Sequence, residues 1–489
     1  MTTLGAAGAT GAPAARVAGP RLPHARVTAI VYAVSMFMTI MHTQIVNVAL
    51  PTLSRSFHVT TATVQWVVTA YLMSMAVLVP ASGWLGDRLG SKRVYLAAIV
   101  VFTGASALCA TSVSFPELVA MRVLQGAGGG MMVPVGMTML YRAYPPEARV
   151  GVARLITRVM VIAPATAPMI GGALVTWASW RWIFTINVPV GLAVAGFGLL
   201  LAEHREPGAG RFDLSGAVLG GAGLGLLLYA VGAGPTDGWG SPAILGTGMA
   251  AVACLAGFGH LELRRAQPML ELRILSDRLF RWCSVANVFS TMAFFGSLVF
   301  VALFLQEARG VSPLDSGLTT FPEAVAIGLA TGPVARAFRR IGPRRVMLAG
   351  FAILAVAAAL LGRMGLSESL WEVRGLCFLL GCGVACIMLS TPAAAFAQIS
   401  SSATGHASAI FNTLNRAAMS MGVALLSTVL ALAGGDVLHG RAPAAAYHWV
   451  FATTLLLAVV GAVVTLWIRD ADAAPAMAGE GEPVLELEA

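Results

Sequence analysis

The feature that most constrains this chain is a series of apolar stretches, each about 20 residues long, that recur between residues 27 and 468. An α-helix needs this length to cross the apolar core of a bilayer, where it satisfies its own backbone hydrogen bonds. Charged residues make up only 11% of the chain, compared with about 25% in soluble domains. The sequence therefore predicts an all-α polytopic membrane protein.

About fourteen stretches meet this length criterion. The expected spans cover residues 27–50, 62–85, 94–113, 116–141, 150–176, 183–202, 214–233, 243–262, 281–305, 314–337, 346–363, 372–397, 406–432 and 446–468. None of the connections is long enough to hold a soluble domain, since the longest polar stretch, near residues 263–280, has the length of one interfacial helix.

Arg and Lys are concentrated in alternate connections, for example at residues 88–93, 264–281 and 336–345. By the positive-inside rule, this pattern predicts that both termini lie in the cytoplasm. We expect the chain to reside in the cell inner (plasma) membrane. The net charge of +9 then reflects topology, and no nucleic-acid partner is expected. Residues 1–26 are expected to form a disordered basic cytoplasmic tail and residues 470–489 an acidic cytoplasmic tail.

The sequence shows no pattern typical of a metal centre, a cofactor site or an enzyme. The six cysteines lie in or beside apolar stretches, without the His or carboxylate neighbours that a metal site requires. No Walker motif, H-E-x-x-H motif or nucleophile elbow is present. We therefore expect no metal, no cofactor and no catalytic residue.

The chain resembles itself at an offset of 252 residues. At this offset "GSKRV" (90–94) aligns with "GPRRV" (342–346), and Arg122 aligns with Arg374. Two similar halves are typical of transporters that alternate between two open states. We expect six-helix bundles at residues 27–203 and 276–469, joined by two linking helices within residues 204–275.

Several motifs together resemble those of the major facilitator superfamily. These are "GWLGDRLGSKRV" (83–94), which resembles its cytoplasmic loop signature, "RVLQGAGGG" (122–130), which resembles its fourth-helix motif, and "APMIGG" (167–172), which resembles its fifth-helix motif. "IVNVALPTL" (45–53), "VQWVVTAYLM" (64–73), "WRWIFTINVPVG" (180–191) and "LDSGLTTFP" (314–322) are similar to segments of the fourteen-helix drug:proton antiporter branch. The resemblance covers residues 27–468 and implies the major facilitator fold.

Two of these motifs are expected to control conformation. The loop after the second span combines charges with glycines and is predicted to form a conformational latch, the alternative being an ordinary basic topology loop. The latch residues are Gly83, Asp87, Arg88, Gly90, Lys92 and Arg93. In the fifth span, Pro164, Pro168, Gly171 and Gly172 are expected to soften the helix and to let it pack closely.

Three residues are candidates for proton coupling. Arg122 lies inside an apolar span, where a charge is costly unless it faces protein or water. His42 stands where the family usually has an aspartate; an imidazole can carry a proton but supplies no negative charge, and the alternative is a neutral, hydrogen-bonded His42. Glu323 follows Pro322 in the tenth span, and it is either a proton site or a wetted residue of the outer vestibule.

The substrate cavity is expected to combine polar side chains with Met and aromatic surface. Its candidates are Met38, Asn47, Gln65, Trp66, Tyr71, Gln125, Arg158, Asn412 and Arg416. For Arg158, snorkelling to the membrane surface is an equal alternative.

The resemblance implies a proton-coupled antiporter that exports amphipathic drugs, antibiotics or metabolites and acts as a monomer in the bilayer. Two alternatives remain open. One is a lipid or metabolite exporter, or a uniporter, on the same fold. The other is a membrane receptor or scaffold that transports nothing.

Overall fold

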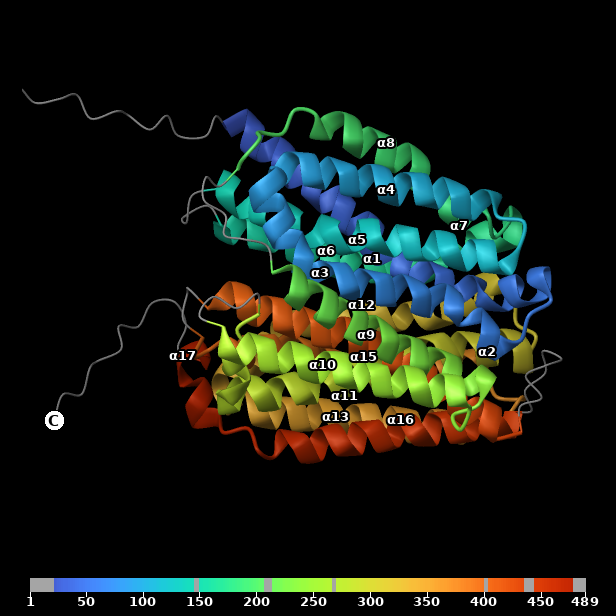
Figure 1. Ribbon diagram of the computed structural model, residues 1–489. Helices are drawn as coiled ribbons and strands as arrows, with labels where there is room; N and C mark the ends of the chain where they lie inside the picture. Colours follow the sequence, from blue (N-terminus) through green and yellow to red (C-terminus); the bar gives the residue numbers. More distant parts are fainter. Residues whose placement is uncertain are drawn as a thin grey trace, which may run out of the picture.

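The computed structural model describes residues 22–144, 149–205, 213–265, 270–399, 403–434 and 444–477. Within this part, fourteen helices of 12 residues or more run side by side, and no residue is in a β-strand (Figure 1). The start of α1 and the end of α16 lie at the same end of the molecule, which we call the terminal end. The all-α fold predicted from the apolar stretches is confirmed.

The first seven long segments end close to the predicted boundaries. They are α1 (Leu22–Phe57), α2 (Thr61–Val64) followed by α3 (Trp66–Leu89), α4 (Ser91–Thr111), α5 (Phe115–Ala143), α6 (Arg149–Trp177), α7 (Trp182–Thr185) followed by α8 (Asn187–Gly198), and α9 (Leu214–Asp237). The remaining helices are α10 (Pro242–Arg264), α11 (Arg278–Leu303), α12 (Pro313–Ile341), α13 (Pro343–Leu361), α14 (Leu370–Ala395), α15 (Thr404–Leu432), α16 (Ala444–Thr465) and the short α17 (Ala474–Met477).

Among the described residues, ten helices are long and apolar enough to cross a membrane by length and composition. The other four expected spans correspond to α3, α6, α8 and α12. α8 has only 12 residues and is broken from α7 at Ile186. α12 contains two internal prolines, Pro322 and Pro333, and many hydroxyl and glycine residues.

The helices form two bundles, one from α1 to α8 and the other from α11 to α16. In the first bundle α5 packs between α3 and α4. A Cβ atom at Gly128 of α5 would lie 2.7 Å from the Phe102 backbone nitrogen of α4, so the glycines of "RVLQGAGGG" permit helix packing.

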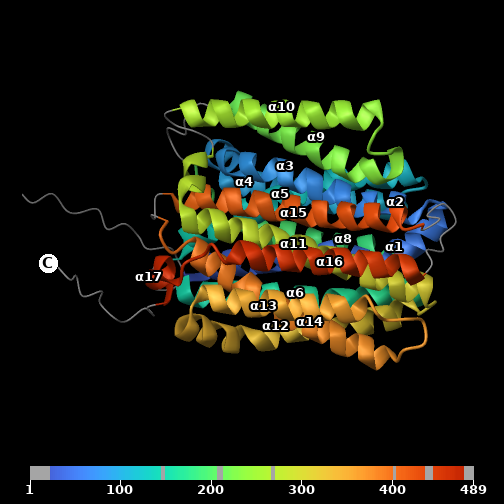
Figure 2. The same cartoon turned by 90° about the horizontal axis from the view of Figure 1, so that it is seen from below.

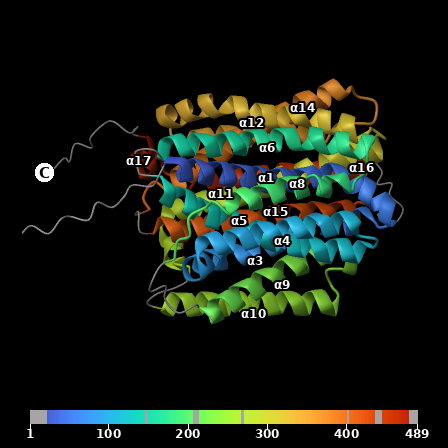
Figure 3. The same ribbon diagram turned by 90° about the horizontal axis from the view of Figure 1, so that it is seen from above.

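The linker hairpin of α9 and α10 lies along one edge of the molecule (Figures 2 and 3). α9 contacts α3 of the first bundle and α15 of the second. At its start, Asp213 accepts a hydrogen bond from the Gly216 N–H and pairs with Arg265 at the end of α10. Burial would raise the pKa of the Asp213 carboxyl, but hydrogen bonds from Arg265 and Gly216 outweigh burial and lower the pKa to about 2. The ion pair that closes the hairpin is therefore lost only as pH falls toward 2.

Candidate functional site

Arg122 of α5 is fully buried at the centre of the first bundle. Its Nε donates to the Val67 carbonyl oxygen at 2.7 Å, and its Nη1 donates to Gln125 Oε1 at 2.7 Å. Nη1 also lies 2.5 Å from Nε2 of His42 on α1. Gln125 extends the chain of contacts, since its Nε2 donates to the Ser106 hydroxyl of α4 at 2.5 Å. The guanidinium thus contacts groups of α1, α3 and α5, and Gln125 links it to α4.

His42 is fully buried and lies between this guanidinium and Asn187 of α8. Nε2 of His42 lies 2.5 Å from Arg122 Nη1, which donates, and 3.0 Å from Gln125 Oε1, which accepts, so the tautomer of the ring decides which of the two contacts is a hydrogen bond. Nδ1 lies 2.9 Å from the Asn187 amide, whose Oδ1 otherwise has no partner among the described residues. The Asn187 Nδ2 that faces His42 also donates to the Ile183 carbonyl oxygen at 3.3 Å.

No carboxylate in the described part contacts this polar cluster of His42, Arg122, Gln125 and Asn187. A second proton on His42 would place two positive charges in contact at low dielectric, which is costly. The arrangement fits the neutral, hydrogen-bonded His42 that the sequence left as one of two possibilities.

Aromatic rings enclose the cluster. The Arg122 Cζ lies 4.1 Å from the centre of the Tyr71 ring, a geometry that favours a cation. The rings of Tyr71, Phe102 and Phe184 surround His42 with centroids 5.4 to 5.8 Å away. The aromatic packing fixes the imidazole and excludes water from it.

A cavity of about 200 Å³ lies between the two bundles. Its lining residues come from α1, α5, α11, α12, α14 and α15, and they are Met36, Ile40, Thr43, Gln44, Val133, Phe294, Phe295, Ala324, Ile327, Met388, Asn412, Asn415, Arg416 and Met419. Two of the predicted cavity residues, Asn412 and Arg416, are in this lining. The walls combine an apolar surface with a few polar groups, as small-molecule sites do.

Glu323 of α12 lies beside this cavity and is 5% exposed. Its neighbour Ala324 and Ile327, one helical turn away, both line the cavity. The Glu323 carboxylate oxygen Oε1 has no hydrogen-bond partner in the described part, and the main-chain carbonyl packs against Gly381 of α14. An ionised carboxylate in such a place is costly, so this side chain is suited to binding and releasing a proton.

The bundles are in contact at the end opposite the terminal end. The Leu314 N–H of α12 donates to the Thr176 hydroxyl of α6 at 3.2 Å, and Gln306 donates to the Val48 carbonyl oxygen at 3.0 Å. A Cβ atom at Gly172 would lie 2.6 Å from the Pro313 carbonyl oxygen. Glycine at this position therefore lets α6 and α12 meet.

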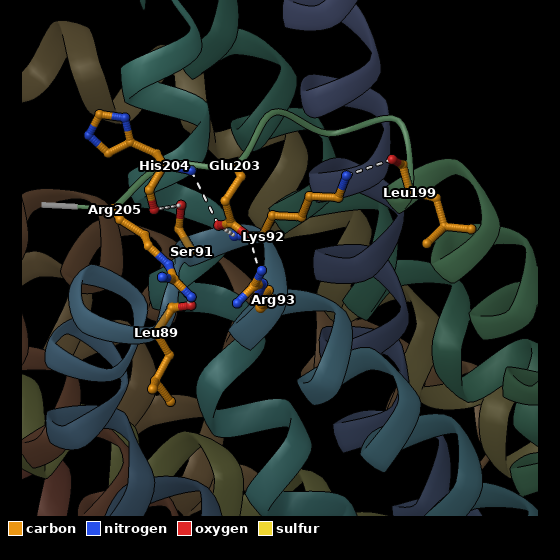
Figure 4. Close-up of polar contacts among 8 residues, drawn as sticks. All are labelled: Leu89, Ser91, Lys92, Arg93, Leu199, Glu203, His204 and Arg205. Carbon is orange, nitrogen blue, oxygen red and sulfur yellow. Dashed lines mark hydrogen bonds and ion pairs between the residues drawn. The ribbon is translucent and has the colours of Figure 1, made fainter.

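At the terminal end, the predicted latch residues contact their own bundle (Figure 4). Glu203, which follows α8, accepts from the Lys92 N–H at 3.1 Å and pairs with Arg93 at 3.5 Å. Lys92 Nζ donates to the Leu199 carbonyl oxygen at 2.7 Å. Arg88 is exposed, while the side chain of Asp87 and the surroundings of Gly83 lie outside the described residues.

The second bundle contains the same kind of helix start, a glycine with positive φ followed by a carboxylate cap. Gly90 and Gly342 have positive φ values of 103° and 86° and directly precede α4 and α13. Just as Glu203 caps α4, Asp470 accepts from the Arg344 N–H at 2.9 Å and caps α13. The sequence repeat thus corresponds to a repeated helix start.

We expect Glu203→Ala to speed hydrogen exchange of the Lys92 amide about two- to fivefold, because a partly exposed N-terminal cap contributes about 0.5–1 kcal/mol. Asp470→Ala should act likewise on the Arg344 amide. Exchange measured by mass spectrometry on overlapping peptides checks both. Glu117→Ala, at the start of α5, is the control and should leave both amides unchanged. Unaltered exchange in Glu203→Ala would contradict the cap.

The other predicted site residues are distributed as follows. Met38 belongs to the apolar core. Asn47 and Gln65 are buried, and each has side-chain polar atoms without a partner in the described part. Trp66 packs against Tyr229 of α9, with ring centroids 5.6 Å apart. Pro168 is buried, whereas the side chains of Arg158 and Pro164 lie outside the described residues.

Sequence reasoning missed Asn187 of the polar cluster and Ser106, which accepts a hydrogen bond from Gln125. Asn187 lies within "WRWIFTINVPVG", a motif that was noted only for its resemblance. A polar amide in an otherwise apolar span is the signal that could have identified it.

The family model for the Major Facilitator Superfamily matches residues 32–423 and 283–485 of this chain. MdtD of Serratia proteamaculans, which is named for multidrug resistance, is 37% identical over 327 residues, which are 67% of this chain and 68% of that protein. The MdtD protein of Pectobacterium atrosepticum is 31% identical over 433 residues, covering 88% and 92% of the two chains. YhcA, an MFS-type transporter of Bacillus subtilis, is 28% identical over 82% of this chain and 75% of its own.

Two solved structures share the fold. A bacterial homologue of the human lysosomal transporter Spinster, in an inward-facing and unoccupied conformation, aligns with a TM-score of 0.66 and 15% identity, covering 92% of this chain and 98% of that one. The human organic anion transporter MFSD10 aligns with a TM-score of 0.59 and 18% identity over 90% and 99% of the chains.

Proposed function

Because the chain belongs to the major facilitator superfamily of multi-pass membrane transporters, we propose that it exports small amphipathic compounds by alternating access, driven by protons moving inward. The observation that carries this proposal is the central cavity, which both bundles line. The contacts between α6 and α12 close one end of the molecule. The relatives named as multidrug resistance proteins support small drug-like substrates.

We assign the terminal end to the cytoplasm, in keeping with the basic connections. The contacts between α6 and α12 then close the outer end of the molecule. Residues 27–203 and 276–469 would rock about the cavity as a monomer in the plasma membrane, with residues 204–275 connecting them.

We assign different roles to two groups of residues. The polar cluster around Arg122 and His42 positions α1, α3, α5 and α8 as one unit, because its buried side chains join these helices through direct polar contacts. Glu323, which lacks a cationic partner in the described part, carries the proton. The observation that favours Glu323 over His42 is the contact of His42 with a permanent cation.

We expect Glu323→Gln to reduce uphill, protonophore-sensitive export at least tenfold, because the amide has a similar shape but binds no exchangeable proton. Downhill exchange of substrate should persist. The measurement is efflux of a fluorescent dye from proteoliposomes with an imposed pH gradient. Glu372→Gln, an exposed residue at the start of α14, is the matched control.

Several results would change the proposal. If Glu323→Gln keeps full uphill export and His42→Ala loses it, the proton-carrying role belongs to His42. Wild-type export that ignores the pH gradient and the protonophore would instead indicate a uniporter on this fold. Absence of any transport would indicate that the protein is a membrane receptor or scaffold.

A further inference from the structure

The central cavity has an unbalanced charge. Arg416 of α15 is the one charged side chain among its described lining residues, and the lining contains no carboxylate. Within the described part, no acidic side chain forms an ion pair with Arg416. A guanidinium at membrane depth is stabilised when it faces water, an anionic group or hydrogen-bond acceptors of the protein. In a low-dielectric site an unpaired guanidinium such as that of Arg416 attracts an anion and repels a cation strongly.

The remaining walls supply an aromatic surface and hydrogen-bonding groups. Phe294 and Phe295 of α11 line the cavity with ring centroids 4.9 Å apart at an interplanar angle of 73°. Asn415 lies next to Arg416 and also lines a small recess of about 10 Å³ with Ser290 and Thr291. Such a recess holds about one water molecule or one polar substituent.

We propose that the compound transported by this chain is an amphipathic organic anion whose acid group pairs with Arg416 and whose apolar body lies against Phe294 and Phe295. The planar guanidinium fork fits a carboxylate through two parallel hydrogen bonds. An inside-negative membrane potential favours outward movement of such an anion. This inference rests on the proposed function as an exporter, but it concerns which ligand the cavity binds.

The test is equilibrium binding of three probes of one shape to the purified protein: 2-naphthylacetate, 2-(2-naphthyl)ethanol and 2-(2-naphthyl)ethylamine. We expect the wild type to bind the anion at least about tenfold more tightly than the amine, because a charge-assisted hydrogen bond is being gained. Arg416→Gln should remove this preference while still binding the alcohol, which shows that the cavity is intact. Arg416→Lys should keep part of it, and Arg416→Glu should reverse it.

The matched control is Arg336→Gln, an exposed position of α12, which should bind all three probes as the wild type does. Equal affinity of the wild type for anion and amine, or an unchanged anion preference in Arg416→Gln, would overturn the inference. Because binding is measured without a proton gradient, it separates this inference from the proposed function. If the protein exports a cationic dye in a protonophore-sensitive manner but shows no preference for the anion, the inference is wrong. The proposed function as an exporter would then still hold.

Discussion

Arg122→Ala is expected to abolish coupled transport, and Arg122→Lys to restore only part of it. The guanidinium donates to the Val67 carbonyl oxygen and to Gln125 Oε1, and it lies against Nε2 of His42. Removing it leaves buried acceptors without donors, at a cost of about 1–3 kcal/mol for each. An ammonium supplies charge but not the planar fork that spans these partners. Initial rates of proton-driven efflux in proteoliposomes measure the effect.

Arg374 provides the matched control, because the repeat aligns it with Arg122. Arg374 is half-exposed near the start of α14, where its Cζ lies 4.4 Å from the centre of the Trp371 ring. Arg374→Ala should therefore transport at close to the wild-type rate. If Arg122→Ala folds, as judged by gel filtration, and transports like the wild type, the polar cluster has no part in coupling.

Gly172→Leu should open the contact between α6 and α12 and lower the population of the closed state at that end, relative to the open state, about five- to 150-fold. Even a Cβ atom there would lie 2.6 Å from the Pro313 carbonyl oxygen, and overpacking of this kind costs about 1–3 kcal/mol. Transport should fall because one of the two alternating states becomes rare. Distances between spin labels introduced at Trp177 and Val311, measured by pulsed electron resonance, report the opening.

The control for this change is Gly332→Leu on α12, where a Cβ atom meets nothing within 4 Å. It should leave the label distance and the transport rate unchanged. A Gly172→Leu variant with the wild-type distance distribution would show that the α6 and α12 contact tolerates a side chain, and the close approach would then carry no conformational role.

The helices were predictable from the sequence because their cause is local. A stretch of apolar residues near 20 in length must form a helix in a bilayer, whatever its neighbours are. The predicted span 116–141 corresponds to α5 (Phe115–Ala143), and 346–363 corresponds to α13 (Pro343–Leu361). Two predicted spans were interrupted: 62–85 is divided into α2 and α3, and 183–202 into α7 and α8.

The sequence by itself also determined that His42, Arg122 and Glu323 lie in apolar spans, because a charged or titratable residue in such a span can be recognised without a structure. What it could not determine is which side chain each of them meets. The partner of His42 is Asn187, 145 residues away, and the partner of Arg93 is Glu203. Trp66 faces the linker helix α9, although its motif suggested the cavity. Helix rotation and packing set these contacts, and they depend on the shapes of all neighbouring helices at once. Tertiary structure alone therefore decided that Arg122 is enclosed by neutral partners while Arg416 faces the cavity.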